Sequence, residues 1–336
     1  MKLKIIILLI FTIVIQSCKK DKIILQPKNE LKRFSKVKEQ IFDLDTINFS
    51  EIKGKNGTLI YFNKNDFNID KKSKVKVILK EYFEFNELVF NNINTVTDKN
   101  ELLESSGVIY LEFQSDGKKI NLKKNKFIEI KLPKEQLKES QLFYAKVDSL
   151  KPVKWKKDDP KYKRIIRVLN VGGGITIERE YIIPSDSLSF YNKKWKKEML
   201  DYQNRISELT KMENYAIRLL SDKYNTMSLI NFDTFIKSGV KLIDFQIESN
   251  NKSVEQLSFY IIYKNRKSFV SLYKTKDNLN FNKIPFIENE TSLLVIGNEN
   301  GNLLFDIIEI KENINKKLIF NLKKYDKKQV QNLLKR

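Results

Sequence analysis

Carboxylates are the side chains of this sequence that could carry acid–base chemistry. The chain has no histidine and one cysteine, which excludes Ser-His-Asp and Cys-His catalysis and histidine-ligated metal sites. Two acidic pairs remain, Asp158-Asp159 and Glu178 with Glu180, and the second pair lies on one face of a predicted strand. A glycoside hydrolase needs two carboxylates that face each other across the scissile bond. Adjacent carboxylates in a lysine-rich loop are more typical of a solvated surface, so no catalytic residue is assigned and a glycan hydrolase is the alternative interpretation.

Two further motifs bear on cofactors and metals. Gly172-Gly173-Gly174 is not followed by the Gly-Lys-Ser/Thr of a phosphate-binding loop, so it predicts a flexible or bulged connection. No D-x-D-x-D-G loop for calcium is present. We therefore expect no cofactor and no metal site, and the chain is not expected to be an enzyme.

The single cysteine follows a segment with the pattern of a secretory signal. Residues 1–17 contain two early lysines and the apolar run Ile5–Ile15. That run is too short to cross about 30 Å of hydrocarbon as a helix. Ile15-Gln16-Ser17-Cys18 resembles a lipobox, with Gln16 at a place usually held by Ala, Ser or Thr. We expect a signal peptide at 1–17 and lipidation of Cys18, with palmitate-type chains that hold the mature protein at a membrane.

The strongly positive charge predicts an anionic partner other than nucleic acid. The formal net charge is +21. Only eight of the 63 basic residues are arginine, the side chain whose planar fork suits phosphate and guanine recognition. An exported protein also rarely meets nucleic acid. We expect contact with an anionic envelope polymer, such as lipopolysaccharide or acidic polysaccharide, or with another envelope protein.

The N-terminal part of the mature chain has β patterning. Residues 18–36 are polar and charged, which predicts a flexible tether. Over 37–133, apolar residues alternate with polar ones, as in Val75, Val77 and Leu79 between lysines. Asp116-Gly117 between two such runs predicts a hairpin. Short strands divided by turns favour a β-sandwich domain over 37–133.

Residues 134–213 form a predicted connector. An irregular segment is followed by an amphipathic helix at about 187–212, because apolar residues recur there at steps of three and four. Lys154 to Pro160 is predicted to be an exposed loop. Trp155, Phe190 and Tyr191 are the candidate partner contacts, with core packing as the alternative for these aromatics.

Alternating patterns return from 214 to 336, and Asn300-Gly301 marks a further turn. They predict a second, Ig-like β-sandwich that ends in a short helix. The expected fold is mainly β, with two antiparallel β-sandwich domains (Ig-like) linked by an irregular segment and one long amphipathic helix.

Several phrases resemble a family of bacterial surface and outer-membrane lipoproteins. The phrases are Asn56 to Phe62, Val75 to Tyr82, the run Leu102-Leu-Glu-Ser-Ser-Gly107, Ile230-Asn231-Phe232-Asp233, and Phe281 to Pro285 with Val295. The resemblance implies an N-terminal β-sandwich-like domain and a C-terminal domain similar to carboxypeptidase-regulatory modules. It implies no activity.

The location is the best-defined part of the functional hypothesis. Lys19 rather than Asp follows Cys18, which agrees with outer-membrane sorting, and Lys19-Lys20-Asp21 resembles surface-export signals. We expect a lipid-anchored protein of the outer membrane, facing the periplasm or the medium, that binds or scaffolds without catalysis.

Overall fold

The computed structural model describes twelve stretches of the chain, and these are 29–44, 49–70, 72–133, 141–146, 153–157, 163–169, 176–182, 213–226, 228–250, 256–272, 279–312 and 317–334. The predicted signal peptide, the glycine run and the helix at 187–212 lie outside these stretches. The described part is mainly β, as the sequence predicts. Its longest helix is α5, Lys327–Leu333, with seven residues.

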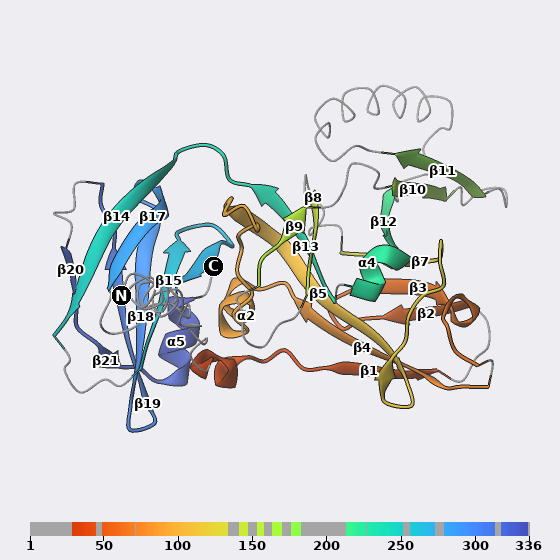
Figure 1. Cartoon of the computed structure of the whole chain (residues 1–336), viewed down its shortest axis with the longest axis horizontal. Coiled ribbons are helices and arrows are strands. Elements are labelled where there is room, and N and C mark those ends of the chain that lie inside the picture. Colours follow the sequence, from red (N-terminus) through yellow and green to blue (C-terminus); the bar gives the residue numbers. More distant parts are fainter. Residues whose placement is uncertain are drawn as a thin grey trace, which may run out of the picture.

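The N-terminal half contains two antiparallel sheets (Figure 1). The first has the order β1-β4-β5-β13-β8-β9, with β6 beside β5, and its strands are β1 Gln40–Leu44, β4 Val75–Tyr82, β5 Leu103–Ser115, β6 Lys118–Lys119, β8 Gln141–Ala145, β9 Lys156–Lys157 and β13 Leu229–Phe235. The second has the order β11-β10-β12-β7-β3-β2, and its strands are β2 Phe49–Lys53, β3 Leu59–Asn63, β7 Phe127–Lys131, β10 Lys163–Leu169, β11 Thr176–Ile182 and β12 Glu213–Leu220.

An apolar core fills the space between these two sheets. Val75, Val77 and Leu79 of β4 contribute to it together with Ile128 and Ile130 of β7, and all five are fully buried. Alternate residues of a strand point to one face, so the alternating pattern in the sequence becomes this buried layer. The hairpin predicted at Asp116-Gly117 is present between β5 and β6.

The C-terminal half has a three-stranded and a five-stranded sheet. The smaller contains β14 Val240–Ser249, β17 Asn280–Ile287 and β20 Lys317–Phe320, and β14 pairs with β20 in parallel. The larger has the order β16-β15-β18-β19-β21, and its strands are β15 Gln256–Tyr263, β16 Phe269–Leu272, β18 Thr291–Glu299, β19 Asn302–Glu309 and β21 Lys323–Lys324. The two sheets enclose an aromatic-rich core around Phe245, Phe259 and Phe281.

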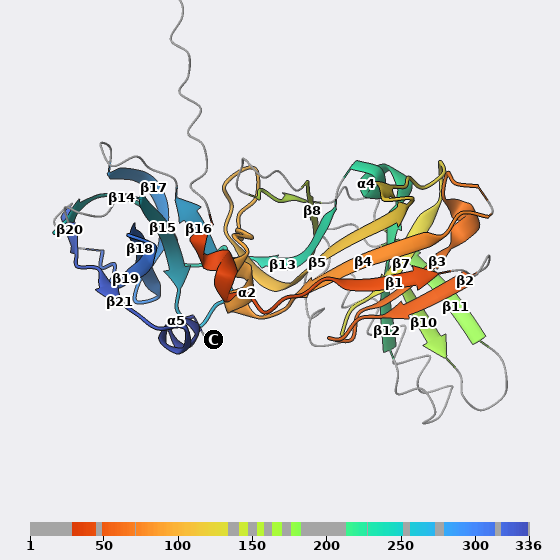
Figure 2. The same cartoon turned by 90° about the horizontal axis from the view of Figure 1, so that it is seen from below.

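The two halves share a third apolar cluster, which we call the junction core. It joins η1 (Glu30–Phe34), α2 (Phe85–Phe90) and α5 to the outer faces of the first N-terminal sheet and of the five-stranded sheet. In Figure 2, η1 (red) and the α2 label stand between the two groups of sheets, and α5 lies beside them at the lower edge of the C-terminal group. Two short helices lie elsewhere, η2 (Lys64–Asp66) and α4 (Ser221–Thr226). The two halves therefore pack against each other through a continuous apolar layer, and not merely through a solvated linker.

The structure differs from the predicted domain bounds at two places. Leu31 and Phe34 of η1, within the predicted tether, are buried in the junction core. The Phe34 ring packs against Phe90 of α2 and Phe305 of β19. The predicted C-terminal domain begins at 214, yet β12 pairs with β7 and β13 pairs with β5 and β8. The C-terminal sheets themselves begin with β14.

Candidate functional site

A pocket of about 560 Å³ opens beside the junction core. Three elements form its walls: the extended segment 35–40, the turn between β2 and β3, and the end of β4 with α2. The lining side chains are Lys36, Val37, Lys38, Gln40, Lys55, Asn56, Glu81, Phe83, Glu84 and Glu87.

Glu81, at the end of β4, is the buried carboxylate that holds the first wall. Its Oε1 accepts a hydrogen bond from the backbone of Thr58 at 3.1 Å. Its Oε2 accepts from Gln40 Nε2 at 2.8 Å and from the backbone of Asn56 at 2.9 Å. Gln40 Oε1 in turn accepts from the backbone of Lys55. The carboxylate therefore replaces backbone partners for a turn that lacks a facing strand.

Glu87, in α2, holds the opposite wall in the same way. Its Oε2 accepts from the Ser35 hydroxyl at 2.6 Å, and its Oε1 accepts from the backbone of Lys36 at 2.9 Å. Asn91 also donates to the Ser35 hydroxyl at 2.9 Å. Segment 35–40 is thus fixed at both ends by a buried glutamate. Because both carboxylates are engaged in this way, neither is placed as a free acid or base.

The lysines of the pocket, unlike its two buried glutamates, are exposed. Lys36, Lys38 and Lys55 are exposed at its rim, and none of their ammonium groups forms an ion pair with another described residue. Glu84, at the N-cap of α2, is the exposed carboxylate of the rim. The groups free to meet a ligand are thus mainly ammonium donors, which suit an anionic molecule.

Tyr82 lies next to Glu81 in the chain and is buried. Burial raises the pKa of its hydroxyl well above the usual range, and the charges of Glu39 and Glu87 raise it further. Tyr82 therefore stays neutral at physiological pH and does not supply a base to this region.

Trp155 is buried and is not a surface contact, so the prediction of an exposed loop at this residue is wrong. Its side chain is 0% exposed and belongs to the junction core. Its Nε1 donates to the Asn94 carbonyl at 2.5 Å, and its backbone bridges to Thr97. Lys156 and Lys157, which follow it, form strand β9 beside β8. A bulky aromatic with a satisfied N–H is stable in such a core.

The other predicted residues are not brought to the pocket by the described structure. Cys18, Phe190, Tyr191 and the pair Asp158-Asp159 lie outside the described residues. Glu178 and Glu180 belong to β11, at register positions opposite Arg167 and Ile165 of β10. The pocket residues Glu81 and Glu87 were not singled out in the sequence. Each interrupts an apolar pattern with a carboxylate, which is the one signal that could have marked them.

Two phrases of the family resemblance meet in the fold. Leu102 to Gly107 includes the start of β5, and Ile230 to Asp233 lies in β13, which pairs with it. The register shifts between Phe232 and Asp233, which face Gly107 and Ser105. The phrases therefore form one irregular, bulged piece of sheet.

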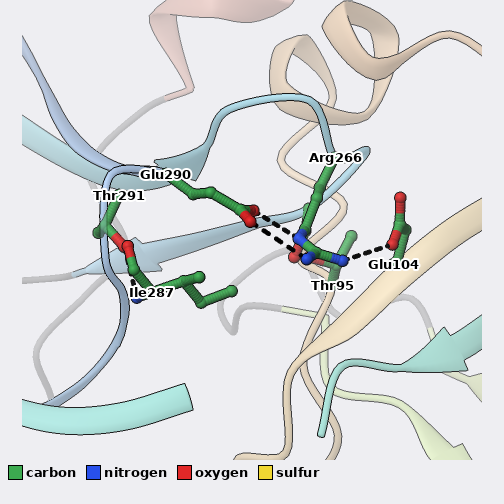
Figure 3. A network of polar contacts seen from close by, with 7 residues as sticks. Thr95, Glu104, Arg266, Ile287, Glu290 and Thr291 are labelled. Atoms are coloured by element: carbon green, nitrogen blue, oxygen red, sulfur yellow. Dashed lines mark hydrogen bonds and ion pairs between the residues drawn. The ribbon is translucent and has the colours of Figure 1, made fainter. Parts of the chain in front are cut away.

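An ion-pair network ties this piece of sheet to the C-terminal half (Figure 3). Arg266, in the turn after β15, binds Glu290 through Nε at 2.5 Å and through a terminal nitrogen at 3.2 Å. Its other terminal nitrogen contacts Glu104 of β5 at 3.2 Å. Close by, the hydroxyl of Thr95 donates to the carbonyl of Phe269, at the start of β16. A planar guanidinium that bridges two carboxylates orients the halves.

No protein-family model, no curated protein and no solved structure matches the chain. Among the residues that the structure describes, no three acidic, histidine or cysteine side chains gather where they could hold a metal ion. Within the same residues no helix is long and apolar enough to span a membrane.

Proposed function

We propose that this chain is a lipid-anchored protein of the bacterial cell envelope, held at the outer membrane through Cys18, that binds or scaffolds without catalysis. The Cys18 motif and its single-cysteine context support the location. The resemblance to surface lipoproteins supports the same interpretation. We also propose that each half is an Ig-like β-sandwich.

One observation carries the binding part of the proposal. In the pocket beside the junction core, Glu81 and Glu87 are used to hold the walls, while the ammonium groups of Lys36, Lys38 and Lys55 are unpaired among the described residues. A fixed concave site with free cations is suited to capture an anion and lacks a free carboxylate pair for hydrolysis. We propose an anionic envelope polymer as the ligand, with lipopolysaccharide as the probe.

The test is binding of purified lipopolysaccharide to the mature protein at physiological ionic strength. Replacing Lys36, Lys38 and Lys55 by Gln removes three cations from the pocket. At about 1 kcal/mol for each basic residue near an anionic surface, the affinity is expected to fall roughly 100-fold.

The matched control replaces three exposed lysines elsewhere, Lys72, Lys118 and Lys311, by Gln. It has the same net charge as the pocket variant, so a purely non-specific attraction weakens equally in both. A control that stays within a few-fold of wild type supports the pocket. Equal losses in the two variants, or no binding by wild type, would contradict it.

Hydrolysis has its own readout. Release of new reducing ends from an envelope glycan by wild type, abolished in Glu178→Gln or Glu180→Gln, would replace the binding proposal by the hydrolase alternative.

A further inference from the structure

A buried acid lies in the junction core, away from the pocket. Asp233 of β13 is 0% exposed, and so is Asn231 two residues before it. Both lie on the face of the sheet that carries Leu229, a member of the junction core. A carboxyl group in this apolar layer has no access to water. Its protonation state is therefore decided by its neighbours.

The hydrogen bonds around Asp233 leave two acceptors unsatisfied. Its Oδ2 accepts from Asn231 Nδ2 at 2.5 Å, and Asn231 Oδ1 accepts from the Ser105 hydroxyl at 3.2 Å. Asp233 Oδ1 is buried without a hydrogen-bond partner. Gln141 faces Asp233 from β8, and its Oε1 is likewise buried without a hydrogen-bond partner.

Side chains that face each other across antiparallel strands have Cβ atoms about 5 Å apart, so these groups are neighbours. An orphaned buried acceptor costs about 1–3 kcal/mol. A single proton donor between Asp233 Oδ1 and Gln141 Oε1 would satisfy both of these acceptors. An ionised Asp233 has none to give, whereas the neutral acid carries one O–H.

We propose that Asp233 is a pH-dependent latch of the junction core. As a neutral acid, Asp233 donates its O–H within the Ser105–Asn231–Gln141 cluster and stabilises the packing of the two halves against each other. On ionisation, Asp233 weakens that packing.

The Asp233 cluster can affect the junction because strand β5 contributes residues to the cluster and also to the contacts with the C-terminal half. The backbone of Ser105 donates to the carbonyl of Lys267, in the C-terminal half, at 2.9 Å. Its side chain donates into the Asp233 cluster. The preceding residue, Glu104, contacts Arg266 in the network of Figure 3. A shift of β5 that accommodates a buried negative charge therefore changes contacts between the halves.

The electrostatic surroundings agree with a neutral acid. Burial raises the pKa of Asp233 to about 7, and the Glu104 charge raises it too. The polar groups of Ser105, Asn231 and the Ser106 backbone near the carboxyl group oppose the rise. Further charged residues on or next to the adjoining elements include Glu112 on β5, Lys146 after β8, Lys156 and Lys157 on β9, Lys237 after β13, and Arg266 and Lys267 in the turn after β15. Gln141 is the uncharged neighbour on β8.

The sign of the pH effect follows from this direction. The folded state holds the proton up to about pH 7, and the unfolded state releases it near pH 4. Stability from the latch is complete below the unfolded pKa and is lost as pH rises through the folded pKa. Relative to Asp233→Asn, which keeps a neutral donor at all pH values, the wild-type folding constant should fall roughly 90-fold between pH 5 and pH 8.

The experiment measures denaturant unfolding of wild type and Asp233→Asn from pH 5 to pH 8.5. Asp43→Asn on exposed β1 is the matched control and should keep the wild-type profile. Hydrogen exchange of residues 103–107 and 264–269, corrected for intrinsic rates, reports the junction. Protection there should drop above pH 7 in wild type and persist in Asp233→Asn.

A second measurement uses wild type alone, in case Asp233→Asn fails to fold. Infrared spectra should show a protonated carboxyl band that titrates near neutral pH. A ratio of wild type to Asp233→Asn that is constant with pH, or a carboxyl already ionised at pH 5, would overturn the proposal. Loss of stability without a change in exchange at the junction would also overturn it, because the acid would then not act on the packing of the two halves.

Discussion

Removal of the Glu81 carboxylate is the sharpest perturbation of the pocket walls. Glu81→Ala leaves Gln40 Nε2 and the backbone amides of Asn56 and Thr58 without their acceptor. Thr58 is fully buried and Gln40 nearly so, whereas Asn56 is exposed and can turn to water. Two buried donors therefore lose their partner.

The expected magnitude follows from that count. A buried donor without a partner costs about 1–3 kcal/mol, and hydrogen bonds to a charged group lie at the upper end. Glu81→Ala should therefore destabilise the fold by roughly 3–5 kcal/mol. Glu81→Gln keeps one acceptor oxygen and should cost about 2 kcal/mol.

The assay is urea unfolding at pH 7, with hydrogen exchange of residues 54–58 as the local readout. Glu39→Gln is the control: it breaks an ion pair with Lys80 in which the Glu39 side chain is 51% exposed, so a loss below about 1 kcal/mol is expected. A loss of stability in Glu81→Ala that is no larger than in this control would show that the carboxylate does not hold the turn between β2 and β3.

Three further substitutions probe the packing. A Cβ at Gly54 would lie 2.6 Å from Glu81 Oε1, so Gly54→Ala should destabilise by about 1–3 kcal/mol in urea unfolding; an unchanged midpoint would show that the carboxylate has room to move. Trp155→Phe removes the hydrogen bond to the Asn94 carbonyl and should cost about 1–2 kcal/mol, with retained stability arguing against that bond. Phe34→Ala empties a site between α2 and β19 and should cost about 3 kcal/mol, with faster proteolysis at the junction; a purely local effect would contradict the role of η1 there.

Local patterns in the sequence predicted the individual strands well. The alternation at Val75, Val77 and Leu79 gave β4, and Asp116-Gly117 gave the β5–β6 hairpin. Asp116 and Gly117 both have positive φ, which short polar residues and glycine tolerate. Such features depend on a few neighbouring residues, so a sequence records them directly.

Long-range pairing was not predictable in the same way. β13 pairs with β5 across more than a hundred residues, and no local pattern distinguishes that partner from a strand of the C-terminal sheets. Leu31 and Phe34 stand in a polar, charged segment whose composition is typical of a tether. Their burial depends on surfaces supplied by α2 and β19, which only the tertiary structure provides.

The candidate sites, too, depend on long-range contacts that local sequence patterns do not predict. The pocket depends on Glu81 and Glu87, which look like ordinary exposed carboxylates until the turn and the segment 35–40 are placed against them. The prediction for Trp155 was wrong because the five charged residues of the segment 154–160 suggested an exposed loop. Its hydrogen-bond partner, the Asn94 carbonyl, is distant in the sequence, so no local pattern indicates the burial.

Membrane attachment through the lipid on Cys18 is tested by fractionation of cells that express Cys18→Ser. Cells that express wild type or the variant are broken, and the membranes are washed with high salt, which screens attraction between surface lysines and anionic lipids. We expect wild type in the washed membranes and Cys18→Ser in the soluble fraction. A variant that remains fully membrane-bound after the wash would contradict it.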